Sequence, residues 1–383
     1  MKKVFLTLSI VVASALAALP AGSAASAPGV VGHVYVNDNT TGVNTIGAFD
    51  RHADGTLTPM AGSPFVAGGA GTGTGLASQG SLQMSSDGRY LVAVDAGSNE
   101  ISVLRIKPDG SLKAVPTGPV SSNGVNPVSI AIADNDVVYV ANAGAATGGA
   151  GSNYSGFRLN HGGHLRALAD STVTLPDGSQ PGDVLFSPDG QKLVGTRVGT
   201  SLIDSFTVDR RGLLSAAPGS PFTAQGLGPF GSEFRPTDAS QLFVSNAHDG
   251  PNAGSVSAFA VGANGALGSI GASPFANNQT APCWVEVSHD GRFLFAVNTA
   301  SGSISSYAIA AGGSLTLLQS TPIAAAGTPE DARLSPDGRT LWVVDPTADT
   351  VSGFAVDGGS LTELPTSPTP APVGAAPAGI VVT

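Results

Sequence analysis

Short runs of apolar residues, some continuous and some alternating with polar residues, recur along the whole chain and are separated by turn signals. Tyr-Leu-Val-Ala-Val at 90–94 and Leu-Trp-Val-Val at 341–344 each follow an Asp-Gly pair within a few residues. Such runs, rich in β-branched and aromatic residues, predict strands, and Asp-Gly between them is a two-residue hairpin signal. Because no long helical periodicity interrupts them, the pattern predicts an all-β protein.

The pattern is a repeat of roughly 50 residues, which is typical of a solenoid, a propeller or an array. Clear Asp-Gly copies occur at 85–95, 187–194, 288–298 and 334–345, with weaker ones at 134–142 and 238–246. A second signature, Gly-x-Leu, begins at Gly55, Gly110, Gly163, Gly212, Gly265, Gly313 and Gly359. A bulky residue precedes each of these glycines by five or six positions: Phe49, Leu104, Phe157, Phe206, Phe259, Tyr307 and Phe354.

Each repeat therefore supplies four strands. The first follows a proline, the second follows Asp-Gly, the third carries the bulky residue and the fourth begins at Gly-x-Leu. Seven units of four antiparallel strands predict a seven-bladed β-propeller.

The two ends of the chain predict how the ring closes. The first unit, starting near His33, lacks an opening strand, and residues 377–383 resemble that strand with nothing after it. We expect the C-terminal strand to complete the first blade, which removes an open sheet edge. The alternative is a proline-rich tail over 365–377.

The strand order assigns the loops to two faces. The Asp-Gly turns and the turns before Gly-x-Leu share one face, here called the hairpin face. The longer connections at 38–43, 68–79, 143–153 and 247–254 share the other, the variable face. Variable loops on a rigid scaffold commonly carry function, so the channel mouth on the variable face is the predicted site. The glycine-rich run at 68–75 is expected to be a flexible loop.

Composition narrows the classes of partner. The chain has 383 residues, 11% of them charged, and a formal charge of −10, so no basic surface is available for nucleic acid. With a single cysteine it has no internal disulfide. Lys2 and Lys3, an apolar run at 4–19 and small residues at 21–27 predict a signal peptide over 1–27. We expect a secreted, monomeric protein with one propeller domain at 30–383 and no membrane span after cleavage.

Candidate chemistry lies on the first strands. Asp183 and Asp331 stand two residues after a strand-opening proline, near the channel mouth. Two residues deeper, about 6.6 Å along a strand, come Glu233, Glu286 and Arg333, and Glu330 is beside Asp331. Such carboxylates with an arginine could activate water and hold a developing oxyanion. They could equally form ion pairs in a polar channel.

Two further residues stand out on the variable face. Most second strands end in Asn or Asp, which are turn residues, but the fourth ends in Arg197, which could bind an anion or pair with a nearby carboxylate. His248 is the one histidine in a long variable-face loop. No histidine or cysteine spacing fits a zinc site, so no metal and no cofactor are expected.

These repeats resemble the seven-bladed β-propeller lactonase family, which includes 6-phosphogluconolactonase-like and carboxymuconate-cyclase-like proteins. The resemblance covers about 30–383 and rests on Ser-Pro-Asp-Gly-Arg, the Phe/Tyr strand and Gly-x-Leu. The family's Pro-Ala-Glu-Ile-Arg is here Pro329-Glu-Asp-Ala-Arg333, so Asp331 replaces a glutamate and Arg333 is kept. The family's Gly-Pro-Arg-His and Asn-Pro-His-Ser are here Gly228-Pro-Phe-Gly231 and Asn126-Pro-Val-Ser129, which lack the histidines and one arginine.

Two functions remain open at this point. The first is a metal-independent lactone hydrolase, in which Arg333 and Arg197 polarise the ester carbonyl and Asp331 or Asp183 activates water. In this hypothesis Glu330, Glu286, Glu233 and His248 bind substrate. The second is a non-catalytic propeller that binds a glycan, a peptide or an envelope protein on its variable face.

Overall fold

A computed structural model describes residue 1 and residues 29–146, 149–324 and 327–383. The signal peptide expected at 1–27 therefore lies outside the described residues, apart from Met1. Among the residues that are described, no helix is long and apolar enough to cross a membrane.

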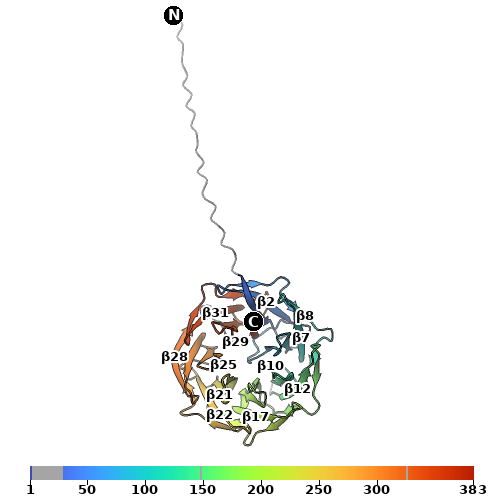
Figure 1. The fold of residues 1–383 in the computed structure, drawn as a ribbon, viewed down its shortest axis with the longest axis vertical. Coiled ribbons are helices and arrows are strands. Elements are labelled where there is room, and N and C mark those ends of the chain that lie inside the picture. The colour runs from blue at the N-terminus through green and yellow to red at the C-terminus, as the bar shows by residue number, and fades with distance from the viewer. Residues whose placement is uncertain (2–28, 147–148, 325–326) are drawn as a thin grey trace.

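Seven antiparallel sheets form a ring around a central axis, as the repeat predicted (Figure 1). The first strands of neighbouring blades contact one another in a closed cycle around the channel. They are β34 (Gly379–Val382), β5 (Leu82–Met84), β10 (Pro127–Ile132), β15 (Pro181–Phe186), β20 (Pro229–Arg235), β25 (Pro282–Val287) and β29 (Ala332–Leu334). The second strands are β1 (Val30–Asn37), β6 (Tyr90–Asp95), β11 (Val137–Asn142), β16 (Lys192–Arg197), β21 (Asp238–Asn246), β26 (Phe293–Asn298) and β30 (Thr340–Asp345).

The third and fourth strands form the outer part of each blade. The third strands are β2 (Thr45–His52), β7 (Glu100–Ile106), β12 (Asn153–Leu159), β17 (Leu202–Val208), β22 (Ser255–Val261), β27 (Ser303–Ile309) and β31 (Thr350–Asp357). The fourth strands are β3 (Leu57–Pro59), β8 (Leu112–Ala114), β13 (Leu165–Ala167), β18 (Leu214–Ala216), β23 (Leu267–Ser269), β28 (Leu315–Pro322) and β32 (Ser360–Glu363). The bulky third-strand residues are all buried between blades, which is why each repeat carries one.

The outer edge is more elaborate than four strands per repeat. In every blade except blade 6, a short strand follows the fourth strand in sequence and pairs with the other end of the third strand. In blade 6 the single strand β28 pairs along the whole third strand. These short strands are β4 (Phe65–Val66), β9 (Val120–Ser121), β14 (Val173–Thr174), β19 (Phe222–Thr223), β24 (Phe275–Ala276) and β33 (Thr369–Pro370). A 3₁₀ turn, η1 (Val198–Thr200), follows β16.

The C-terminal strand closes the ring, as predicted. β34 pairs antiparallel with β1, from Val34 opposite Val382 to Asn37 opposite Gly379. Thr383 N–H donates to the His33 carbonyl (2.8 Å), and Arg51 from the third strand of the same blade donates to the Thr383 carbonyl. The first blade is thus assembled from both ends of the chain.

Deletion of residues 377–383 should open the ring. The variant loses the first strand of blade 1, which exposes the edge of β1 and removes the contacts of β34 with β5 and β29. We therefore expect loss of cooperative thermal unfolding or a fall of more than roughly 10 °C in Tm. Differential scanning calorimetry measures this. A truncated protein that unfolds like the full chain would contradict closure by this strand.

Candidate functional site

The channel is closed on the variable face by residues 76–80, here called the plug. This segment connects the first blade to the second, and it crosses the mouth of the channel rather than running over the surface. The channel mouth expected as the site on this face is therefore covered by the plug, and a pocket remains beside it. No pattern in the sequence indicated the path of the plug, because the segment has no counterpart in the other repeats.

Hydrogen bonds tie the plug to the blades across the ring. Ser78 Oγ donates to the Val128 carbonyl of blade 3 (2.7 Å), and Gln79 N–H donates to the Gly182 carbonyl of blade 4 (3.1 Å). The Gln79 side chain donates to the Ser232 carbonyl (2.9 Å) and accepts from Val285 N–H (3.0 Å). Ser78 and Gln79 are consequently buried.

Trp284 of blade 6, Gly231 of blade 5 and Gly80 of the plug also contribute to the packing of the plug. Trp284 Nε1 donates to the Ser78 carbonyl (2.6 Å). A Cβ atom on Gly231 would lie 2.1 Å from Gln79 Oε1 and 2.8 Å from the Cys283 carbonyl oxygen, so glycine at this position in blade 5 leaves room for the Gln79 side chain. Gly80 N–H then donates to Asp331 Oδ2 (3.3 Å), which links the plug to blade 7.

The glycine-rich run before the plug is hydrogen-bonded to the loop at 39–40, although most of its residues are exposed. Gly71 N–H donates to the Thr40 carbonyl and Gly73 N–H to the Asn39 carbonyl (2.9 and 2.8 Å). A Cβ atom on Gly71 would lie 2.2 Å from the Asn39 carbonyl carbon, so the glycine permits a close backbone approach. The expectation of a flexible loop did not foresee these bonds.

Asp183 and Asp331 lie directly beneath the plug. Asp183 Oδ2 accepts from Ser232 N–H (2.9 Å) and Ser232 Oγ (2.5 Å), and Oδ1 accepts from Ser129 Oγ (3.2 Å). Burial raises the pKa of Asp183 to about 7, although these hydrogen bonds act in the opposite direction. Burial likewise raises the pKa of Asp331 to about 6, while Arg333 and the Gly80 N–H lower it.

The next layer of the channel contains Glu233, Glu286 and Arg333. Arg333 Nη1 donates to Glu286 Oε2 (3.1 Å), and Glu286 Oε1 accepts from Leu334 N–H (2.9 Å). Burial alone would lower the pKa of Arg333, but the carboxylates of Glu286 and Asp331 raise it above its usual value. Glu233 is half-buried, and neither of its carboxylate oxygens has a hydrogen-bond partner among the described residues. Burial and then the Glu286 carboxylate hold the pKa of Glu233 well above its ordinary value.

Arg333 is reached from the hairpin face. Its side chain is 25% exposed and lines a pocket of 270 Å³, here called the channel pocket. The other lining residues come from the first strands and hairpin turns of neighbouring blades: Gln83, Met84, His289, Leu334, Pro336, Val381 and Val382. The arrangement therefore presents one guanidinium, held by a carboxylate, to a small pocket with Glu233 close to it.

Glu330 supports the plug instead of the channel pocket. It is 6% exposed, and a Cβ atom on Gly75 would lie 2.0 Å from its Oε1. Burial raises the pKa of Glu330 well above its ordinary value, and its Oε2 has no hydrogen-bond partner among the described residues. We expect a neutral carboxyl that holds the start of the plug.

Arg197 is engaged in an ion pair between strands. Its Nε and Nη2 donate to the two oxygens of Asp204 (2.6 Å each), and Tyr154 Oη donates to Asp204 Oδ2 (3.1 Å). In other blades the same two positions hold an asparagine bonded to a serine hydroxyl, as in Asn298 and Ser305 (2.9 Å). Of the two alternatives for Arg197, the structure shows the pairing. Asp204 was missed, although it breaks the repeat at the position that pairs with Arg197.

His248 lies in a separate pocket on the variable face. This pocket, of 270 Å³, is bounded by Leu76 and Ala77 of the plug and by side chains of blades 3 to 5, including Val128, Val198 and Phe230. None of the channel carboxylates lines it. The eight candidate residues therefore occupy four places: the layer under the plug, the layer of Arg333, the ion pair of Arg197 and this apolar pocket.

The raised pKa values predict how stability varies with pH. In the folded protein Asp183 keeps its proton up to about pH 7, whereas in the unfolded chain it ionises near pH 4. Raising the pH from 5 to 8 therefore favours unfolding. In Asp183→Asn this contribution is absent. Between pH 5 and pH 8 the free energy of unfolding of the variant should therefore rise by about 2 kcal/mol relative to that of wild type.

Urea unfolding at pH 5, 6, 7 and 8 checks this prediction. The exposed Asp134→Asn provides a control with the same change of charge. A constant difference between Asp183→Asn and wild type at all four pH values would show that Asp183 ionises normally in the fold.

Comparisons with known proteins agree with this architecture. The sequence profile described as "Lactonase, 7-bladed beta-propeller" matches residues 43–148 and 120–373. The periplasmic gluconolactonase PpgL of Pseudomonas aeruginosa superposes with a TM-score of 0.71 at 20% identity, covering 92% of this chain and 99% of that one. A protein from Lactobacillus plantarum superposes with a TM-score of 0.73 at 21% identity, with the same coverage. A search of the curated proteins finds no match. At these identities the structural likeness shows the fold alone, whereas the sequence profile spans most of the chain, and the protein belongs to the seven-bladed β-propeller lactonase family.

Proposed function

We propose that the protein hydrolyses lactones at the channel pocket, with Arg333 as the electrophilic group and Glu233 as the general base. The observation that carries this proposal is a partly exposed guanidinium that lines the channel pocket, together with a half-buried carboxylate of raised pKa near enough to feel its charge. Membership of the lactonase family and the fold shared with a gluconolactonase support it.

The chemistry needs two groups. The lactone carbonyl oxygen accepts a hydrogen bond from Arg333, which stabilises the negative charge that develops on that oxygen. Glu233 takes a proton from water as the water oxygen attacks the carbonyl carbon, and a tetrahedral oxyanion forms. The ring C–O bond then breaks, and the leaving alkoxide takes the proton from Glu233. The product is a hydroxy acid, and both side chains return to their starting states.

Glu233 is a better base than Asp183 or Asp331 for a geometric reason. Both oxygens of Asp183 accept hydrogen bonds under the plug, and Asp331 is bonded to Gly80 and to Ala332 N–H. These two carboxyls act on the site through their charge. Four carboxyl groups surround the single arginine, so an uncharged lactone is favoured over a phosphorylated one. The basic and apolar sequence of residues 1–27 supports export, which would place the substrate outside the cytoplasm.

A second candidate is the binding of a glycan, a peptide or an envelope protein on the variable face without catalysis. The apolar pocket beside the plug, with His248 in its wall, favours it. The two proposals separate cleanly, because binding there requires neither Arg333 nor turnover.

Substitution of the two proposed catalytic groups should abolish most of the activity. With a panel of sugar and acyl lactones, we expect kcat/KM of Arg333→Gln to fall by roughly 10² to 10³, as for loss of one oxyanion donor. For Glu233→Gln we expect a loss of about 10² or more. Arg292→Gln, on an exposed hairpin of the same face, should match wild type.

The same assay distinguishes Glu233 from Asp331 as the general base. Asp331→Asn should lose far less activity than Glu233→Gln, and the reverse order would assign the base to Asp331. Because Arg333→Gln leaves Glu286 without its ion pair, thermal unfolding of each variant is measured alongside. Wild-type protein without turnover above background on the whole panel would sink the hydrolase proposal.

The same assignment predicts the pH dependence of catalysis. Glu233 must be ionised to accept a proton, and its pKa is raised, so kcat/KM should increase with pH through that raised value and then level off. The profile of Glu233→Gln should lack this step. A wild-type profile that falls over the same range would instead assign Glu233 as an acid.

A further inference from the structure

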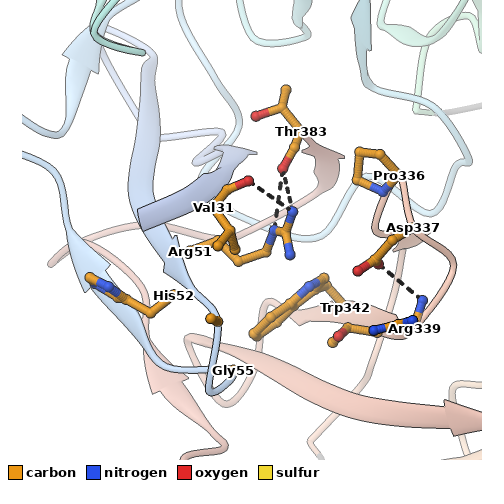
Figure 2. Close-up of a pocket in the computed structure, with 11 residues that line it drawn as sticks. Val31, Arg51, His52, Gly55, Pro336, Asp337, Arg339, Trp342 and Thr383 are labelled. Atoms are coloured by element: carbon orange, nitrogen blue, oxygen red, sulfur yellow. Dashed lines mark hydrogen bonds between the residues drawn. The ribbon is translucent and has the colours of Figure 1, made fainter. Parts of the chain in front are cut away.

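A larger pocket lies at the junction between blade 7 and blade 1, where the ring is closed. It measures about 590 Å³ and opens on the hairpin face, and we call it the seam pocket. Its walls come from Arg51 and Gly55 of blade 1, from Asp337, Arg339, Thr340 and Trp342 of blade 7, and from Thr383 after the closing strand. Figure 2 shows Arg51 and Trp342 next to each other, with Asp337 and Arg339 across from them.

Comparison with the other junctions shows why a pocket exists here. At five of them the residue equivalent to Thr340 packs against the Gly-x-Leu glycine of the next blade. These pairs are His33 with Gly110, Tyr90 with Gly163, Val137 with Gly212, Gln241 with Gly313 and Phe293 with Gly359. At the seam, Thr340 does not reach Gly55; Leu364 packs in front of this glycine instead, and both Thr340 and Gly55 line the pocket.

Two hydrogen-bond donors in this wall have no partner among the described residues. Trp342 is 1% exposed, and its Nε1 is an orphan. A Cβ atom on Gly353 would lie 2.5 Å from Trp342 Cζ3, so the opposite edge of the indole, which carries Nε1, faces away from Gly353. Tyr139, at the equivalent position in blade 3, donates its hydroxyl to the Gly212 carbonyl (2.8 Å).

Arg51 supplies the other donor. Its Nε and Nη2 donate to the Thr383 carbonyl (3.2 and 2.9 Å), and Nη2 reaches the Val31 carbonyl at 3.5 Å. No bond is formed by Nη1, which in Figure 2 points toward Trp342. Of the two donors only Trp342 Nε1 is fully buried, and a buried, unpaired donor is unfavourable unless a ligand satisfies it.

The charge of the pocket limits the ligand. Arg51 and Arg339 face one carboxylate, Asp337, whose pKa Arg51 helps to lower. The two guanidinium groups favour an anionic ligand, and Asp337 would repel a dianion such as phosphate more strongly than a monoanion. Asp337 and Thr340 can bond to hydroxyl groups, and the volume lies within the range of small-molecule sites.

We propose that the seam pocket binds a small hydroxy-carboxylate of the sugar-acid class, with its carboxylate on Arg51 Nη1 and Trp342 Nε1. Arg339 adds positive charge, and the hydroxyl groups face Asp337 and Thr340. This binding does not depend on the proposed hydrolysis, because none of these residues belongs to the channel pocket. A bound ligand would also join the two blades that close the ring.

Titration with sodium D-gluconate at constant ionic strength tests this proposal. Because the chain has only two tryptophans, Trp284 and Trp342, a saturable change in intrinsic fluorescence reports on the pocket, and calorimetry gives the affinity. Thr340→Phe, which copies the junction at Phe293, should weaken binding at least tenfold while the protein stays folded. Trp342→Phe and Arg339→Gln should each weaken it by about three- to tenfold. Arg292→Gln, at the equivalent hairpin position of blade 6, should not.

Three outcomes would overturn the proposal. One is the absence of saturable gluconate binding to wild type, or undiminished binding to Thr340→Phe. Another is equal affinity for neutral D-sorbitol or for inorganic phosphate, which would remove the monocarboxylate assignment. The third is binding lost in Arg333→Gln but retained in Thr340→Phe, which would place gluconate in the channel. A lactone panel without turnover would leave the seam site standing.

Discussion

The pairing of β34 with β1 is the interaction on which the rest of this structure depends. Seven twisted sheets bury the bulky residues of their third strands only against neighbouring blades, so each blade needs a partner on both sides. Without the closing strand, blade 1 would lack its first strand, and β5 and β29 would lose the strand that lies between them. Every site described above is defined by residues from several blades, and therefore by this closure.

Ring closure also creates a channel that has to be filled. The plug satisfies backbone groups of blades 3 to 6 and excludes water from the layer beneath it. In that setting carboxyl groups retain their protons at higher pH, and Asp183 and Asp331 show the consequence. The plug thus gives the channel one open end, at Arg333, and sets the electrostatic character of the site there.

The fold could be predicted because it repeats. Gly-x-Leu, Asp-Gly and the bulky third-strand residue recur with the period of the blades, and the strand-opening prolines placed Asp183, Asp331 and Arg333 at the right depth. The plug could not be predicted, since residues 76–80 occur once and their partners are 50 to 250 residues away. The ion pair of Arg197 and Asp204 was only half predicted. Comparison of the repeats at both positions, and not only at Arg197, would have revealed it.

The two pockets on the hairpin face, the channel pocket and the seam pocket, share one wall residue. Pro336, in the hairpin between β29 and β30, lines both the channel pocket and the seam pocket. The proposed hydrolysis at Arg333 would yield a hydroxy acid, which is the class of molecule proposed to bind in the seam pocket. The hairpin that contains Pro336 would then lie between the channel pocket, where the carboxylate would form, and the seam pocket, where it would bind. Occupancy of the seam pocket could alter the channel pocket through Pro336, because a shift of this hairpin changes both walls.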